Sequence, residues 1–255
     1  MDYGLQISAS GALAGIHRQN ALTNNLANAN TVGFKPILTG TMHRLAVRQE
    51  DNLPYLASDA LLEKLGGGVL SAQTRIDFAQ GALQTSDSQW DMAIQGDGFF
   101  VVGDPSNPSL TRDGRFAVNA DGELVMAITG VPVLSVGNSP IHIDITQGEI
   151  LVQNDGTILQ GGAPIDQIQI SDVPNRSILT KLGAGLLGSP SGEPLSLIEA
   201  TGSLNQYMLE SSGVNEIDAL MQIQSASRSA KSNIGMIDLQ NRLIERAINT
   251  FGRIG

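Results

Sequence analysis

Residues 215–251 read NEIDALMQIQSASRSAKSNIGMIDLQNRLIERAINTF. The stretch contains no proline, and its apolar and small residues recur at alternating steps of three and four, the spacing of a coiled-coil seam. Asn215, followed three residues later by Asp218, is suited to cap the first turn of a helix. We therefore predict a helix of about 36 residues, whose seam contains Leu220, Ile223, Ser227, Ala230, Ile234, Ile237, Asn241, Ile244, Ile248 and Phe251.

A second helix is predicted near the N-terminus, from Leu5 to about Asn28, where proline is again absent. Its face is narrow and consists mostly of small residues, so it can bury little apolar surface by itself. Two long seams can pack in a single core or against other molecules, and we favour intermolecular packing. The residues expected to form this assembly interface are Leu5, Ile16, Leu26, Leu220, Ile223, Ile234, Ile237, Ile244, Ile248 and Phe251.

Between the helices, the pattern changes to short apolar runs separated by turn residues. Pairs such as Asp113-Gly114, Asp121-Gly122 and Asp155-Gly156 are expected to close hairpins. Segment 183–194, rich in glycine, is expected to form a loop or a long connection. The runs predicted as strands are 92–94, 99–102, 115–118, 124–128, 141–145, 150–152, 157–159 and 165–170.

These patterns predict an α+β fold. Terminal helices form a coiled-coil-like assembly region, and a central domain is mainly antiparallel β structure. The expected division is residues 1–36 for the N-terminal helix and turn, 37–74 for an extended arm, 75–212 for the β domain, and 213–255 for the C-terminal helix.

Composition excludes several classes of function. The 255 residues include no cysteine, which excludes disulfides, thiolate metal sites and cysteine nucleophiles. A net charge of −10 argues against general binding to nucleic acid or to anionic membranes. No apolar run approaches the roughly 18 residues of a membrane span, and the N-terminus lacks the basic and apolar regions of a cleavable secretory signal.

A search for catalytic and ligand-binding motifs gives nothing convincing. The three histidines, His17, His43 and His142, lie in separate segments without a second ligand at helical spacing. Segment 183–188 matches a dinucleotide-binding string, but no strand precedes it and Pro190 prevents the required helix. We expect no catalytic residue, no metal and no cofactor.

The stretch Asn24-Asn25-Leu26-Ala27-Asn28-Ala29-Asn30-Thr31-Val32-Gly33-Phe34-Lys35 closely resembles a signature near the N-terminus of bacterial flagellar rod and hook proteins. Three further blocks fit the same family in order. They begin at Phe78, Thr111 and Leu209, and they contain Gly81, Gly96-Asp-Gly, Arg112-Asp-Gly and Glu210. In the first motif, asparagines compete with helical hydrogen bonds and Gly33 permits a left-handed turn, so the helix is expected to end there with Phe34 anchoring the exit.

The resemblance implies a structural subunit of the flagellar basal-body rod, of the proximal- or distal-rod type, which polymerises through its terminal helices and transmits torque. Implied partners are other copies of the chain, other rod and hook axial proteins, and the flagellar type III export apparatus. The implied location is the periplasmic rod, reached without a cleaved signal peptide. Two alternatives stay open: a secreted β-domain hydrolase or glycan-binding protein with helical oligomerisation arms, and a hook or hook-associated paralogue.

Overall fold

In the computed structural model, which describes residues 3–46, 49, 66–190 and 192–252, the chain divides into two units. We call them the helical unit and the β unit. The helical unit combines segments 1–27, 37–75 and 215–255, and the β unit combines segments 28–36 and 76–214. Both ends of the chain thus belong to one unit.

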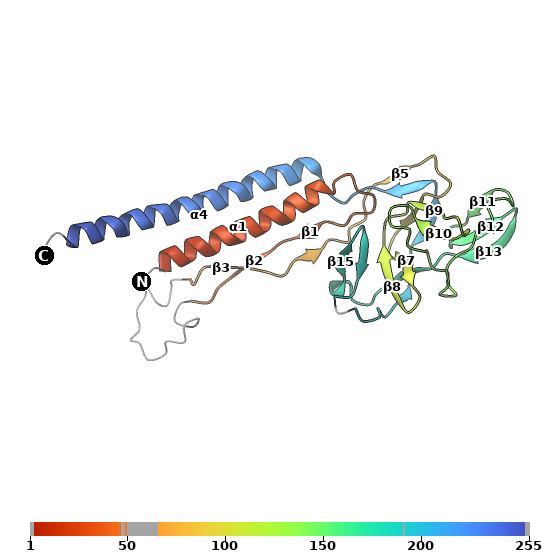
Figure 1. Ribbon diagram of the computed structural model, residues 1–255, viewed down its shortest axis with the longest axis horizontal. Helices are drawn as coiled ribbons and strands as arrows, with labels where there is room; N and C mark the ends of the chain where they lie inside the picture. The colour runs from red at the N-terminus through yellow and green to blue at the C-terminus, as the bar shows by residue number, and fades with distance from the viewer. Residues whose placement is uncertain (1–2, 47–48, 50–65, 191, 253–255) are drawn as a thin grey trace. The chain divides into compact units, whose positions relative to one another are not determined.

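The helical unit is built on two long helices, α1 (Tyr3–Ala27) and α4 (Glu216–Phe251), which lie side by side and run antiparallel (Figure 1). The side chain of Asn215 accepts hydrogen bonds from the backbone amides of Ile217 and Asp218, at 3.0 and 3.2 Å. The predicted cap and the predicted C-terminal helix are therefore confirmed.

Small residues bring α1 and α4 close together. Gly15 of α1 lies against Ala230 of α4, and Gly11 lies against Asn233. The less exposed residues of α4 recur at alternating steps of four and three, as expected for a seam that stays on one partner helix. They are Ala219, Ile223, Ala226, Ala230, Asn233, Ile237 and Gln240; Ser227, next to Ala226, is also only partly exposed.

A two-stranded ribbon packs on α1 within the helical unit. Strand β2 (Thr41–His43) pairs antiparallel with β3 (Val69–Ser71), and β1 (Ile37–Leu38) precedes them. The hydroxyl of Ser10 on α1 accepts a hydrogen bond from the backbone amide of Val69 at 3.1 Å. The expected arm is thus a ribbon over its described residues; the remainder of segment 37–74, residues 47–48 and 50–65, lies outside the described part.

The β unit consists of short strands, and every described strand pair in it is antiparallel. Its largest sheet has six strands in the order β15-β16-β8-β7-β14-β17, and β11-β12-β13 forms a three-stranded sheet. A short 3-10 helix spans Arg176–Ile178. The bounds are β4 (Arg75–Ile76), which starts at the border of the unit, β5 (Leu83–Thr85), β6 (Met92–Gln95), β7 (Phe99–Asp104), β8 (Asn107–Thr111), β9 (Phe116–Val118), β10 (Leu124–Met126), β11 (Ile150–Val152), β12 (Thr157–Gln160), β13 (Ala163–Gln167), β14 (Ile170–Asp172), β15 (Thr180–Gly183), β16 (Leu186–Gly188), β17 (Ile198–Glu199), β18 (Ser203–Gln206) and β19 (Met208–Glu210).

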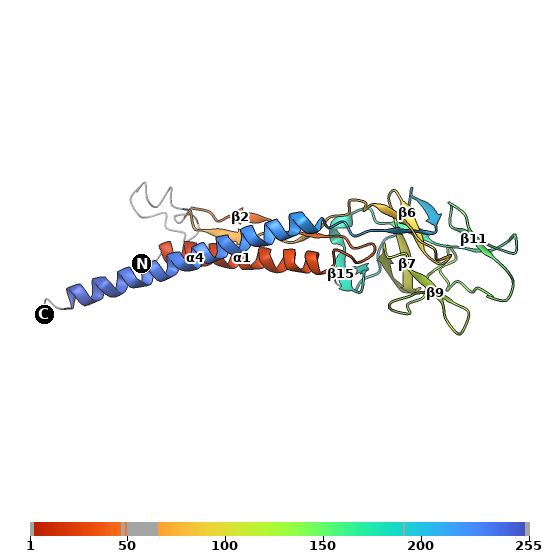
Figure 2. The same cartoon turned by 90° about the horizontal axis from the view of Figure 1, so that it is seen from above.

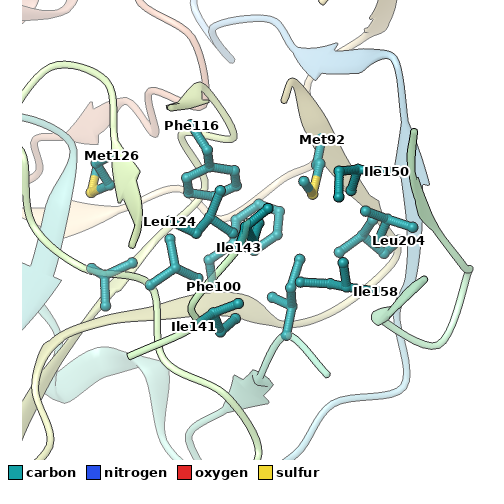
Figure 3. Packing of buried hydrophobic residues seen from close by; sticks show 14 of the residues in the cluster. Met92, Phe100, Phe116, Leu124, Met126, Ile141, Ile143, Ile150, Ile158 and Leu204 are labelled. Carbon is teal, nitrogen blue, oxygen red and sulfur yellow. The ribbon is translucent and has the colours of Figure 1, made fainter. Parts of the chain in front are cut away.

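Strand β7 separates two apolar cores. Phe100 and Val102 point into the larger core, and Phe99 and Val101 point into the smaller one, because successive side chains of a strand face opposite sides. In the larger core, Phe100 meets Phe116 edge to face, with 5.0 Å between the ring centroids (Figure 3). Most other members are aliphatic, as the scarcity of aromatic residues in the sequence requires.

Four local expectations for the β unit are wrong. Asp113-Gly114 closes no hairpin, because β8 pairs with β7 and β16, whereas β9 pairs with β10; Gly114 instead packs against the backbone of Met92. Segment 183–188 is not a loop but part of the β15–β16 hairpin, which buries Leu187. Segment 141–145 contains a single isolated bridge, between His142 and Glu123 beside β10. The predicted strand 165–170 is divided between two strands, β13 and β14. The other two Asp-Gly pairs do close hairpins, β9–β10 and β11–β12.

Candidate assembly interface

The family motif begins in the last turn of α1, and its remaining residues lie in a turn, residues 28–36, which packs within the β unit. Gly33 has a φ of +66°, so the predicted left-handed turn is confirmed. Its backbone amide donates to the carbonyl oxygen of Glu210 at 2.7 Å, and the Gly213 amide donates to the carbonyl oxygen of Phe34 at 3.0 Å. The turn is therefore bound to the segment that leads into α4.

A buried ion cluster lies beside this turn. The carboxylate of Glu210 accepts from the Lys35 ammonium at 2.6 Å and from the Arg112 guanidinium at 3.1 Å. All three side chains are at least 96% buried, with exposed fractions of 1, 3 and 4% for Glu210, Lys35 and Arg112. The same carboxylate accepts the backbone amide of Gly81 at 2.8 Å. One anion thus serves two buried cations.

Backbone carbonyls complete the shell of these cations. Arg112 donates to the carbonyl oxygens of Ile94 and Gly96, at 3.2 and 2.6 Å, and Lys35 donates to that of Ala79 at 2.9 Å. Burial lowers the pKa of Lys35 and of Arg112, and the nearby Glu210 carboxylate opposes this. The cluster holds together five segments of the chain, around residues 35, 79–81, 94–96, 112 and 210.

A second lysine reaches the motif turn without an anion. The Lys181 ammonium lies 3.5 Å from the centroid of the Phe34 ring, and its nitrogen has no hydrogen-bond partner among the described residues. Burial lowers the pKa of Lys181 to about 8. The aromatic face of Phe34 favours the charged form and partly offsets that penalty. Phe34, 9% exposed, anchors the chain after the turn, as its place in the motif suggests.

Another motif residue, Asn25 of α1, holds strand β1 to this helix inside the helical unit. Its amide nitrogen donates to the carbonyl oxygen of Ile37, and its carbonyl oxygen accepts from the amide of the same residue, both at 2.8 Å. Asn25 is 5% exposed. Its side chain therefore acts like a strand partner for β1, a role that sequence reasoning missed.

The close packing at Gly33 leads to a testable prediction. A Cβ atom at this position would clash with the backbone carbonyl of Arg112, and φ is positive. Gly33→Val should lower the free energy of unfolding of the β unit by about 2 kcal/mol or more. From sequence alone, Gly33→Asn should be milder than Gly33→Val, because asparagine tolerates positive φ. In the structure, however, the Cβ of asparagine would meet the same Arg112 carbonyl. We expect Gly33→Asn to fail as well, measured by urea denaturation. A Gly130→Asn control, where φ is +69° and nothing lies near the Cβ, should be close to neutral.

The residues predicted for assembly lie on two kinds of surface. Half of them are exposed by 41 to 66%: Ile16, Leu220, Ile234, Ile244 and Ile248. Four others are half-buried: Leu5, Leu26, Ile223 and Ile237. The side chain of Phe251 lies outside the described part. The exposed members are free to contact another molecule, whereas Ile223 and Ile237 belong to the seam toward α1.

The helical unit exposes many large apolar side chains in addition to those predicted. They lie on both helices and on the ribbon, the elements that Figure 2 shows from a second side. Such a set is unusual for a monomer and marks an interaction surface. The additional residues are Leu13, Leu38, Met42, Leu45, Leu70, Ile217, Met221, Met236, Leu239 and Leu243.

The described residues offer little for catalysis or for metal binding. Among them, no group of three or more His, Asp or Glu side chains could hold a metal ion. No described helix is long and apolar enough to cross a membrane. An open groove of about 550 Å³ in the β unit is lined by residues that include His142 and Asp144. Hydrogen bonds from Thr146 lower the pKa of Asp144, so this carboxyl is suited to remain ionised rather than to act as a general acid.

Comparison with known proteins gives consistent matches. The family model for flagella basal body rod proteins matches residues 5–35, and the model for the D1 domain of flagellar hook proteins FlgE/F/G matches residues 93–160. The flagellar basal-body rod protein FlgF of Rhizobium meliloti is 31% identical over 253 residues, 99% of each chain. FlgF of Caulobacter vibrioides is 30% identical over 255 residues, 100% of each chain. The rod protein FlgG of Buchnera aphidicola subsp. Schizaphis graminum is 30% identical over 257 residues, 95% of this chain and 97% of its own.

Proposed function

The chain belongs to the FlgF/FlgG family of flagellar basal-body rod proteins, and on this premise we propose that it polymerises through α1 and α4 into a shaft that transmits torque. It is a structural subunit of the rod and not an enzyme. The observation that carries the proposal is the row of exposed apolar side chains along both helices. Contacts repeated in every subunit would bury this surface.

We also propose that the subunit leaves the cytoplasm through the flagellar type III apparatus and joins other copies and other axial proteins in the periplasm. The absence of cysteine is compatible with an oxidising compartment. Family membership supports contacts with further rod components.

Substitution at Ile234 tests the assembly proposal. Its side chain is 45% exposed, so Ile234→Asp should leave the chain folded. In a rod, the new carboxylate would be buried against a neighbour without a partner, at a cost of several kcal/mol per contact, typically about 3–5. We expect cells that carry only this variant to lose swimming and assembled rods, while the purified chain keeps its helical circular dichroism signal.

Ile234→Met is the matched control, because it keeps the apolar contact and nearly the same volume. Cells with this variant should swim normally. Normal swimming with Ile234→Asp would remove this face of α4 from the assembly interface.

A further inference from the structure

The C-terminal part of helix α4 extends beyond the N-terminal end of α1. Gly4, near the start of α1, lies against Gln240, so the last turns of α4 have no partner on α1. Figures 1 and 2 both show α4 continuing past the N-terminus of α1. Every described side chain from residue 241 to residue 250 is exposed. We call residues 241–250 the α4 overhang.

The overhang has the side chains of a contact surface and not of a solvated helix end. Leu243, Ile244 and Ile248 are exposed by 56, 41 and 66%. A helix of this kind gains most of its stability from burying an apolar face, which the described part of this chain does not provide. Its charged residues, Arg242, Glu245 and Arg246, give it a net charge of +1.

The opposite end of α4 is complementary. Residues 215–224, here called the α4 start, carry Glu216 and Asp218 and no cation. Three apolar side chains are exposed there as well: Ile217, Leu220 and Met221, by 70, 49 and 65%. The helix dipole accounts for the two carboxylates at this position, but it does not account for the apolar side chains or for the arginines, which lie before the last turn of α4.

We propose that the α4 overhang of one copy packs in parallel beside the α4 start of the next copy. This arrangement brings Arg242 and Arg246 level with Glu216 and Asp218, and it covers both sets of exposed apolar side chains. Because the two surfaces differ and lie at opposite ends of one helix, the contact is heterologous and builds an open filament. The inference rests on the proposed polymerisation and specifies its axial contact.

Cysteine crosslinking tests the contact directly. The chain has no cysteine of its own, so Met221→Cys and Ile248→Cys introduce the only thiols. These positions are 27 residues apart on one helix, or about 40 Å at the helical rise, so a short bismaleimide cannot link them within one chain. In cells that carry only the double variant, we expect a ladder of dimer, trimer and higher products. Each single variant can give at most a dimer.

Charge reversal provides a second test. Arg242→Glu with Arg246→Glu should abolish swimming, and adding Glu216→Arg with Asp218→Arg to the same chain should restore it. Failure of this rescue, or a swimming double-cysteine strain that gives no ladder, would overturn the head-to-tail contact. Either of these results leaves the proposed function standing if the wild-type chain is found in isolated basal bodies. If the wild-type chain is absent from isolated basal bodies, the proposed function itself is overturned.

Discussion

Replacing Glu210 with alanine should lower the free energy of unfolding of the β unit by about 3–5 kcal/mol. The substitution removes the carboxylate that forms ion pairs with both Lys35 and Arg112, which are 3 and 4% exposed. Each cation would remain buried without a counter-ion, and the Gly81 amide would lose its acceptor. The loss should be seen by urea denaturation as a lower midpoint with a similar slope.

Substitution of Lys35, a partner of Glu210, separates the contributions of the charged groups to the stability of the cluster. Lys35→Met removes one cation and its desolvation cost, while Arg112 keeps its ion pair with Glu210. This variant should therefore cost less than Glu210→Ala. Glu193→Ala changes an exposed carboxylate of the same unit and should be close to neutral. If Glu210→Ala and Glu193→Ala have equal stability, the cluster contributes nothing to the fold.

The positions of this cluster illustrate what sequence analysis could and could not reach. Lys35, Gly81, Arg112 and Glu210 each lie in a different block that resembles the rod and hook family. Nothing in their spacing shows that the blocks meet, because contacts between segments so far apart depend on how the strands pair. The hydrophobic periods predict strands and helices, but they do not encode the order of strands in a sheet.

For the helices, the period was predictable and the packing face was not. The sequence pattern favours large apolar residues such as Leu220 and Ile234, which are exposed by 49 and 45%. Contact with α1 instead uses small neighbours such as Ala219 and Ala226, which are 5 and 4% exposed. Close approach of two helices selects small side chains, and a scale of hydrophobicity ranks these too low to reveal the seam. The large residues are left for contacts outside the helix pair.

In the β unit, turn chemistry predicted Asp121-Gly122 and Asp155-Gly156 correctly but not Asp113-Gly114. In the two hairpins, the glycine has a positive φ of +82° or +89°. Gly114 is required for a different reason. It lies so close to the backbone of Met92 that a Cβ atom would not fit between them. The same dipeptide can therefore serve a turn or a close backbone contact, and only the tertiary structure distinguishes them.

Enlarging Ala230 to leucine should separate α1 from α4 and stop rod assembly. Ala230 is 4% exposed. A Cβ built on the facing Gly15 would lie only 3.1 Å from the Cβ of Ala230, so the helices already touch at this level. A leucine has no space between them, and such overpacking typically costs about 1–3 kcal/mol. The helix pair buries few large side chains and has little stability to lose, because its seam consists largely of Gly, Ala, Ser and Asn.

We expect cells with only Ala230→Leu to be non-motile, and the purified chain to lose helical circular dichroism signal at lower temperature than the wild type. Ser229→Leu is the matched control, because it adds a larger apolar side chain at the adjacent, exposed position of α4. The control should keep the thermal stability of the helix pair. If Ala230→Leu melts and swims as the wild type does, α1 and α4 do not need this close contact, and assembly depends on their outer faces alone.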